Sequence, residues 1–177
     1  MSSMRKFAAI LALTLWAAVG SARAQVAGVF PVQGTNLTEG EGAAIGVLIA
    51  SAYAQQIRER VLGPNELAAS LQETASERES AQQIGLREYI HVEAVHLAQR
   101  TAVHAELRNK WGSLLFEVRD TALSLDDMEV VAQRIAAALA RRTPLENTRT
   151  IDTVTLREAR GKTACSSRRS SACASRW

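Results

Sequence analysis

The feature that most constrains the fold is a change of hydrophobic period along the chain. Residues 89–119 alternate apolar and polar side chains with a period of two, whereas the segments on either side show helical spacing. We therefore expect three strands, joined by tight connections at Ala98-Gln99 and at Asn109 to Gly112. Their apolar sides are Ile90, Val92 and Ala94 in the first strand, Val103, Ala105 and Leu107 in the second, and Leu114, Phe116 and Val118 in the third.

Charge complementarity selects the register of the first of these hairpins. One register that matches the apolar faces places His91 opposite Glu106 and Glu93 opposite His104. The competing register would set Glu93 against Glu106, and two like charges directly opposite each other are destabilising. We expect the first register.

The segment before this block predicts strands that alternate with helices. Val26 to Val32 is a short apolar run and the first candidate strand, followed by a loop that starts at Gln33. Thr38 and Glu41 form a capping box, which predicts a helix from about Glu39 to Ile57. Arg60 to Leu62 is the second short strand, and the alternation indicates parallel crossover units.

Two further helices precede the strand block and one follows it. Gly63-Pro64 breaks the chain, and a helix is expected from Asn65. A second capping box, Ser76 with Glu79, predicts a short helix that Gly85 ends. Ser124 with Asp127 caps the last helix, which Pro144 stops. Its buried stripe is predicted to consist of Met128, Val131, Ile135 and Leu139.

These elements predict an α/β fold with a mixed sheet, in the order β-α-β-α-β-β-β-α, as a single domain. The helices are expected mainly on one face of the sheet, while the other face carries His, Glu and Arg side chains. This domain is expected to span residues 25–145, followed by a linker at 146–162 and a disordered basic tail at 163–177.

The first 24 residues predict export. Arg5 and Lys6 precede an apolar run that is too short to span a membrane, and Ala22-Arg23-Ala24 supplies small residues for cleavage after Ala24. No cysteine lies near that point, so no lipobox is expected. The protein is therefore predicted to be periplasmic, outer-membrane-associated or secreted, where nucleotide-dependent chemistry is improbable.

Charge argues against a nucleic-acid partner. The whole chain has 21 Lys+Arg and 18 Asp+Glu, but three basic residues leave with the signal and five lie beyond Glu158. The segment between carries 13 basic and 18 acidic residues, a net charge of about −5. The basic balance therefore belongs to the two ends and not to the expected domain.

The tail holds both cysteines, Cys165 and Cys173. In an oxidising compartment they could pair, whereas their spacing is unusual for a zinc site. The composition changes abruptly near Lys162, and a frameshifted or truncated gene explains this as well as a native tail does. Mixtures of Arg, Ser, Ala and Cys are typical of GC-rich DNA translated in a wrong frame.

One group of side chains has the composition of a metal site. His91, Glu93, His104 and Glu106 share a sheet face in the expected register, and two His with carboxylates can bind zinc. A solvated face of cross-strand charge pairs is the favoured interpretation, so no metal, cofactor or catalytic residue is predicted. The string from Gly40 to Gly46 resembles a dinucleotide motif, but its acidic residues would repel a pyrophosphate.

The opening "VAGVFPVQGTNLTEGEGAAIGVLIASAY" and the later "SLDDMEVVAQRIAAAL" resemble the α/β domain shared by the TolB amino-terminal region and the CsgG/LpoB-type envelope proteins. More closely, the chain resembles uncharacterised secreted proteins of myxobacteria and relatives, in which such a domain precedes a carboxyl-terminal β-rich or outer-membrane segment. It covers about Val26 to Thr155 and implies a non-enzymatic envelope role through protein contacts.

The sequence therefore predicts an exported protein-binding or scaffolding domain, the amino-terminal module of a larger outer-membrane-associated protein. Its partners would be envelope proteins, with no small-molecule substrate inferred. The polar sheet face and the edge strand are the candidate contact surfaces. The alternative is an exported metal-dependent hydrolase that uses His91 and His104.

Overall fold

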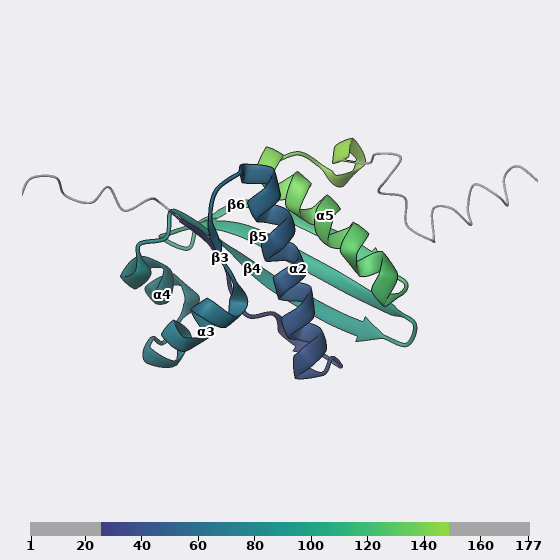
Figure 1. Ribbon diagram of the computed structural model, residues 1–177, viewed down its shortest axis with the longest axis horizontal. Coiled ribbons are helices and arrows are strands. Elements are labelled where there is room, and N and C mark those ends of the chain that lie inside the picture. Colours follow the sequence, from purple (N-terminus) through teal and green to yellow (C-terminus); the bar gives the residue numbers. More distant parts are fainter. Residues whose placement is uncertain (1–25, 149–177) are drawn as a thin grey trace, which may run out of the picture.

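A six-stranded mixed sheet and four α-helices make up residues 26–148, the part of the chain that this computed structural model describes (Figure 1). The predicted signal, most of the linker and the tail lie outside these residues. In chain order the elements are β1 (Ala27–Val29), β2 (Gln33–Thr35), α2 (Glu39–Ile57), β3 (Val61–Leu62), α3 (Pro64–Glu73), α4 (Glu77–Ile84), β4 (Glu88–Leu97), β5 (Arg100–Asn109), β6 (Leu114–Ala122), α5 (Leu125–Arg141) and the 3₁₀ turn η1 (Leu145–Thr148).

The strand order is β3-β1-β4-β5-β6, so the first strand of the chain lies inside the sheet. It pairs in parallel with β3 on one side and with β4 on the other. The hairpins β4–β5 and β5–β6 are antiparallel. The α/β class, the mixed sheet and the parallel crossovers predicted from the sequence are confirmed.

The prediction was wrong where the first strand ends. The structure ends β1 at Val29 and starts a second short strand, β2, inside the predicted loop. Pro31 has no backbone N–H to give to a ladder, so pairing is interrupted there. The chain then rejoins the sheet further along β4, with Gln33 opposite Glu93.

Side chains cap the helices where the sequence predicted them. The Thr38 hydroxyl accepts a hydrogen bond from the Glu41 backbone N–H at 3.3 Å, and the Glu41 carboxylate accepts one from the Thr38 N–H at 2.8 Å. Ser76 and Ser124 cap α4 and α5 by accepting from the backbone N–H three residues on. The capping box predicted for Ser76 is only half formed, because the Glu79 carboxylate accepts from the Ala75 N–H at 3.2 Å and not from that of Ser76. Helix α3 begins at Pro64, one residue before the prediction, because proline is favoured in the first helical position.

The predicted register of the β4–β5 hairpin is confirmed along its whole length, including the pairs His91 with Glu106 and Glu93 with His104. A two-residue turn at Ala98-Gln99 joins the strands, as expected. The β5–β6 hairpin has a register irregularity between Leu107 and Arg108, which changes the pairing at the start of β6.

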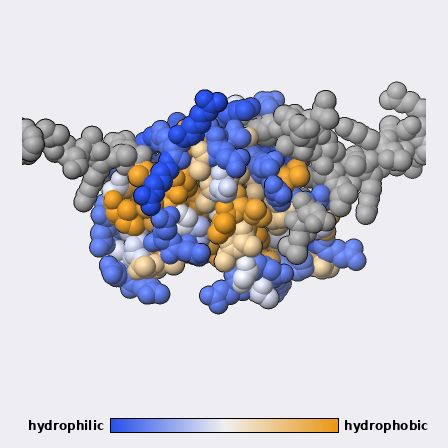
Figure 2. Space-filling view, in the orientation of Figure 1, coloured by the Kyte–Doolittle hydropathy of each residue, from blue (hydrophilic) through white to orange (hydrophobic). Residues whose placement is uncertain are grey.

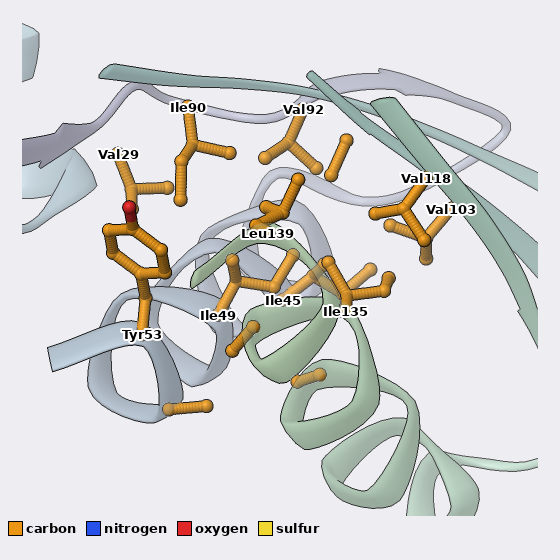
Figure 3. Close-up of a cluster of buried hydrophobic side chains, with 14 of the residues drawn as sticks. Val29, Ile45, Ile49, Tyr53, Ile90, Val92, Val103, Val118, Ile135 and Leu139 are labelled. Carbon is orange, nitrogen blue, oxygen red and sulfur yellow. The ribbon is translucent and has the colours of Figure 1, made fainter. Parts of the chain in front are cut away.

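The main core lies between the sheet and the two long helices, α2 and α5 (Figure 3). Ile45 and Ile49 of α2 and Ile135 and Leu139 of α5 point toward Val92 and its neighbours on the strands. All four residues of the predicted α5 stripe are buried. The long helices thus occupy one face of the sheet, as predicted.

The shorter helices α3 and α4 pack against the beginning of the opposite face. A second buried cluster forms there, and it consists of Phe30, Leu67, Ala81, Leu86 and Tyr89. The ring of Phe30 contacts that of Tyr89 edge-to-face at 5.2 Å between centroids. The polar face that the sequence predicted therefore starts beyond Tyr89, at His91, beside the end of α4 that carries Glu77.

Two buried polar pairs tie the helices to the sheet. The Tyr53 hydroxyl of α2 donates a 2.9 Å hydrogen bond to the Glu88 carboxylate of β4. Arg134 of α5 forms an ion pair with Asp120 of β6, at 3.5 Å between Nε and Oδ2. None of the described helices combines the length and the apolar character that a membrane span requires.

Candidate functional site

The polar face of the sheet is a continuous cluster of ionisable side chains on β4, β5 and β6. Alternation along each strand places them there, because every second residue points away from α2 and α5. The cluster includes the four residues singled out in the sequence, His91, Glu93, His104 and Glu106, together with Glu117 of β6 and Glu77 of α4.

His91 is held by a helix and not by the strand opposite. Its Nδ1 lies 2.9 Å from Oε2 of Glu77, and its Nε2 lies 3.5 Å from Oε1 of Glu93. The hydrogen bond with Glu77 raises the pKa of the His91 imidazole above its ordinary value, with Glu93 adding to the effect and burial opposing it. Glu77 was missed from the sequence, because its contact depends on how α4 packs on the sheet.

His104 lies at the centre of a ring of carboxylates. Its Nε2 is 3.4 Å from Oε2 of Glu117 and 3.8 Å from Oε1 of Glu106, while its Nδ1 is 3.7 Å from Oε2 of Glu93. One ligand atom from each of His104, Glu106 and Glu117 lies within 4.8 Å of the others. His91 does not join this set, so the geometry divides the predicted group into two.

Glu106 has a second partner on its outer side. Arg108 donates to Oε2 of Glu106 through Nε at 2.8 Å, which leaves Oε1 directed toward His104. Burial alone would raise the pKa of the Glu106 carboxyl. The Arg108 guanidinium outweighs this effect and lowers that pKa below its ordinary value. Glu106 is therefore an anchored anion beside the imidazole.

Helix α2 carries a different kind of surface. From Gly42 to Ile57 this helix contains no charged residue. Its outward side is nevertheless exposed or half-buried, and Val47 keeps 47% of its surface accessible. We call the following residues the α2 surface: Ala43, Ala44, Val47, Leu48, Ser51 and Ala54. Figure 2 shows apolar atoms gathered over the middle of α2, with hydrophilic atoms on either side.

A groove of about 850 Å³ adjoins the α2 surface. It lies between the first half of α2, the start of α5 and the β4–β5 turn. Its apolar lining includes Leu37, Ile45, Leu48 and Met128, and its polar lining includes Glu41, His96, Arg100 and Thr101. His96 therefore lies on the α2 side of the sheet, away from His91 and His104, as the alternation predicted.

The edge strand β6 combines exposed apolar side chains with features that protect an open edge. Leu114 and Leu115 at its start are exposed, as is Trp111 in the preceding turn. The register irregularity lies at this same end, and Glu117 and Arg119 follow along the strand. Bulges and charges are the usual means by which a protein protects an open edge from pairing.

The Gly40 to Gly46 string has a packing role. Glu41 uses its carboxylate in the capping box, and a Cβ on Gly46 would lie 2.7 Å from Cγ of Pro64. Gly46 thus allows α2 to approach the start of α3. This packing contact explains why a glycine is needed at position 46, and no bound nucleotide has to be invoked.

No protein-family model matches this chain, and no curated protein sequence matches it. Among solved structures, PelC from Paraburkholderia phytofirmans is 16% identical, with 65% of this chain and 84% of that chain covered and a TM-score of 0.45. The LpoB C-terminal domain from Salmonella enterica is 13% identical, with 63% and 92% covered and a TM-score of 0.44. TolB from Acinetobacter baumannii is 11% identical, with 68% and 28% covered and a TM-score of 0.49.

LpoB and TolB are two of the proteins whose shared domain the sequence resembles. The identities reach no more than 16% in these three matches, and at that level a structural match carries no information on function. The predicted closeness to secreted myxobacterial proteins stays a prediction.

Proposed function

We propose that this chain is a protein-binding domain of the bacterial cell envelope, which acts by contact and not by catalysis. One observation carries the proposal: α2 has no charge between Gly42 and Ile57, yet one side of it is open to solvent. A helix in water normally carries charged or polar side chains along its solvent side, whereas most of the exposed positions of α2 between Gly42 and Ala54 are apolar. The α2 surface is therefore the natural place for a partner.

The side chains of the α2 surface suit a close contact. Most are small, so a partner can approach the helix backbone closely, as in tightly packed helix pairs. Single exposed apolar residues are ordinary on protein surfaces. A run of uncharged positions from Gly42 to Ile57 is different, because contiguous apolar patches mark interaction sites.

The groove beside the α2 surface supplies an anchor point. Leu37, Leu48 and Met128 provide an apolar lining, and Arg100 and Thr101 lie at the polar end. Binding energy at protein interfaces concentrates in side chains that fill such pockets. The partner we propose is an amphipathic segment with a bulky apolar side chain in the groove and its apolar side along α2.

The envelope location is supported by the sequence. The predicted signal and the resemblance to TolB and CsgG/LpoB-type domains indicate a protein that functions outside the cytoplasm. The acidic balance of residues 25–158 disfavours nucleic acid. An envelope protein is thus the proposed partner, and association with the outer membrane belongs to the same proposal.

Photo-crosslinking tests the surface directly. A benzophenone amino acid at position 47 should give a discrete adduct in cells, and the same group at the exposed Gln83 of α4 should not. The disrupting change is Ala44→Asp, which puts a charge between the α2 surface and the groove. It should abolish the adduct without changing the circular dichroism spectrum.

The mass of the adduct identifies the partner class. An envelope protein that crosslinks at position 47 and is lost with Ala44→Asp supports the proposal. Equal crosslinking from positions 47 and 83, or no adduct from position 47 in a folded, exported protein, contradicts it. An adduct that consists of two copies of this chain contradicts the envelope partner and indicates that the α2 surface mediates self-association.

A further inference from the structure

We infer that His104, Glu106 and Glu117 form a binding site for a zinc-class divalent cation on the polar face of the sheet. The inference is independent of the α2 surface, which lies on the other side of the sheet. It differs from the metal site considered from the sequence, because Glu117 takes the place of His91.

The distances fit the edges of a small coordination polyhedron. Ligands bound to zinc at about 2.0–2.1 Å in a tetrahedron lie about 3.3 Å apart. Nε2 of His104 is 3.4 Å from Oε2 of Glu117 and 3.8 Å from Oε1 of Glu106. The two distances from His104 are thus close to the required spacing, and one ligand atom from each of the three residues lies within 4.8 Å of the others.

The outer contacts are those that metal ligands usually have. Oε2 of Glu93 lies 3.7 Å from Nδ1 of His104, so a carboxylate stands behind the imidazole. Arg108 holds the oxygen of Glu106 that faces away from the site, at 2.8 Å from Nε. A carboxylate behind a ligating histidine, and a hydrogen bond to a ligating carboxylate, orient both groups for a metal.

The sheet register supplies an independent reason for a cation here. Glu106 lies directly opposite Glu117 in the β5–β6 pairing. Two carboxylates in opposed positions repel each other, and a divalent cation between them would remove that repulsion. One nitrogen and two oxygen ligands suit zinc better than magnesium or calcium, which prefer oxygen alone. Three protein ligands would leave one position for water.

Zinc titration against a chromophoric chelator tests the site. The purified protein should carry Cys165→Ser and Cys173→Ser, so that the tail thiols cannot bind the metal. We expect one zinc ion per chain. His104→Ala and Glu117→Gln should each lower the affinity at least about tenfold, and Glu93→Gln should lower it about 10- to 100-fold.

His96→Ala is the matched control, because His96 lies on the other side of the sheet and should leave zinc affinity unchanged. With Co²⁺ in place of zinc, the visible absorption bands of a four- or five-coordinate ion should appear and should be absent in His104→Ala. Circular dichroism establishes that each variant is folded.

Three results would overturn the inference. The first is no saturable zinc binding by the folded protein. The second is binding that survives both His104→Ala and Glu117→Gln. The third is binding that His91→Ala abolishes and Glu117→Gln leaves intact, which would place the metal at the His91 group. The first result would also remove the metal-dependent hydrolase as an alternative function.

Discussion

At the scale of single residues, His91 shows how packing changes the chemistry of a side chain. Glu77 from α4 and Glu93 from its own strand both contact the ring, and Glu106 faces it from β5. The hydrogen bond with Glu77 has the largest effect in raising the pKa of His91, and Glu93 adds to it, while burial opposes both. The raised pKa couples the charge of His91 to the docking of α4.

The sign of the pH effect follows from that raised pKa. Stabilisation by protonated His91 is fully present below about pH 6.5, the ordinary pKa of histidine, and is lost as the pH rises through the higher pKa of the folded state. We expect NMR titration with a chelator present to give a His91 pKa above the ordinary value. Glu77→Gln should lower it.

Unfolding measured over the same pH range provides the control. Glu77→Gln should reduce the fall in the free energy of unfolding above about pH 6.5, whereas Glu73→Gln, at an exposed position on α3, should leave it unchanged. A His91 pKa at or below that of an unfolded peptide would contradict the contact with Glu77.

At the scale of elements, α2 depends on a close approach to the segment that follows it. A Cβ on Gly46 would lie 2.7 Å from Cγ of Pro64 and 3.2 Å from Cγ2 of Val32. Gly46→Ala should therefore lower the free energy of unfolding by about 1–3 kcal/mol, since overpacking outweighs the gain in helix propensity. Chemical denaturation measures this change.

Gly40 in the same helix is the matched control. A Cβ there would meet nothing within 4 Å, so Gly40→Ala should raise stability by about 0.5–1 kcal/mol through helix propensity alone. If both alanine variants are stabilised, the contact of α2 with Pro64 is looser than the structure indicates.

The same elements show which features a sequence can predict. The caps at Thr38, Ser76 and Ser124 are local, since donor and acceptor lie three residues apart. The β4–β5 register was predictable because a two-residue turn and one charge pattern leave few alternatives. Caps and register are therefore features that the residues themselves determine.

Features that depend on packing could not be predicted in this way. Strand β2 pairs with β4 about 60 residues later, and the contact of Glu77 with His91 requires α4 to lie on the sheet. Glu117 alternates correctly in the sequence, but the irregularity near Arg108 hides its register. The uncharged run of α2 is visible in the sequence. Helical spacing alone does not show, however, that one side of this helix is left exposed to solvent.

At the scale of the whole molecule, stability should be distributed unevenly over the sheet. Strands β4 and β5 pair over ten residues each, and the main core packs against them. Strands β2 and β3 contribute three and two residues. Native-state hydrogen exchange should find the slowest amides in β4, β5 and α5, and much faster exchange in β2 and β3.

The comparison within one strand sharpens this expectation. Ala94 and Val95 of β4 pair with β2 on one side and with β5 on the other. An amide N–H of β4 that bonds to β5 should therefore exchange slowly with solvent even when β2 separates from the sheet. Equal protection of β2 and β5 would show that the sheet opens only as a unit.

The position of β1 also determines the order in which the chain can fold. Ala27 pairs with Glu88, which is made only after about 60 further residues have been added. Until then β3 offers it two residues of pairing. The centre of the sheet cannot close while the first half of the chain is emerging, because its main partner strand does not yet exist. The export that the first 24 residues predict requires a chain that stays unfolded during transit, and this strand order delays closure by topology alone.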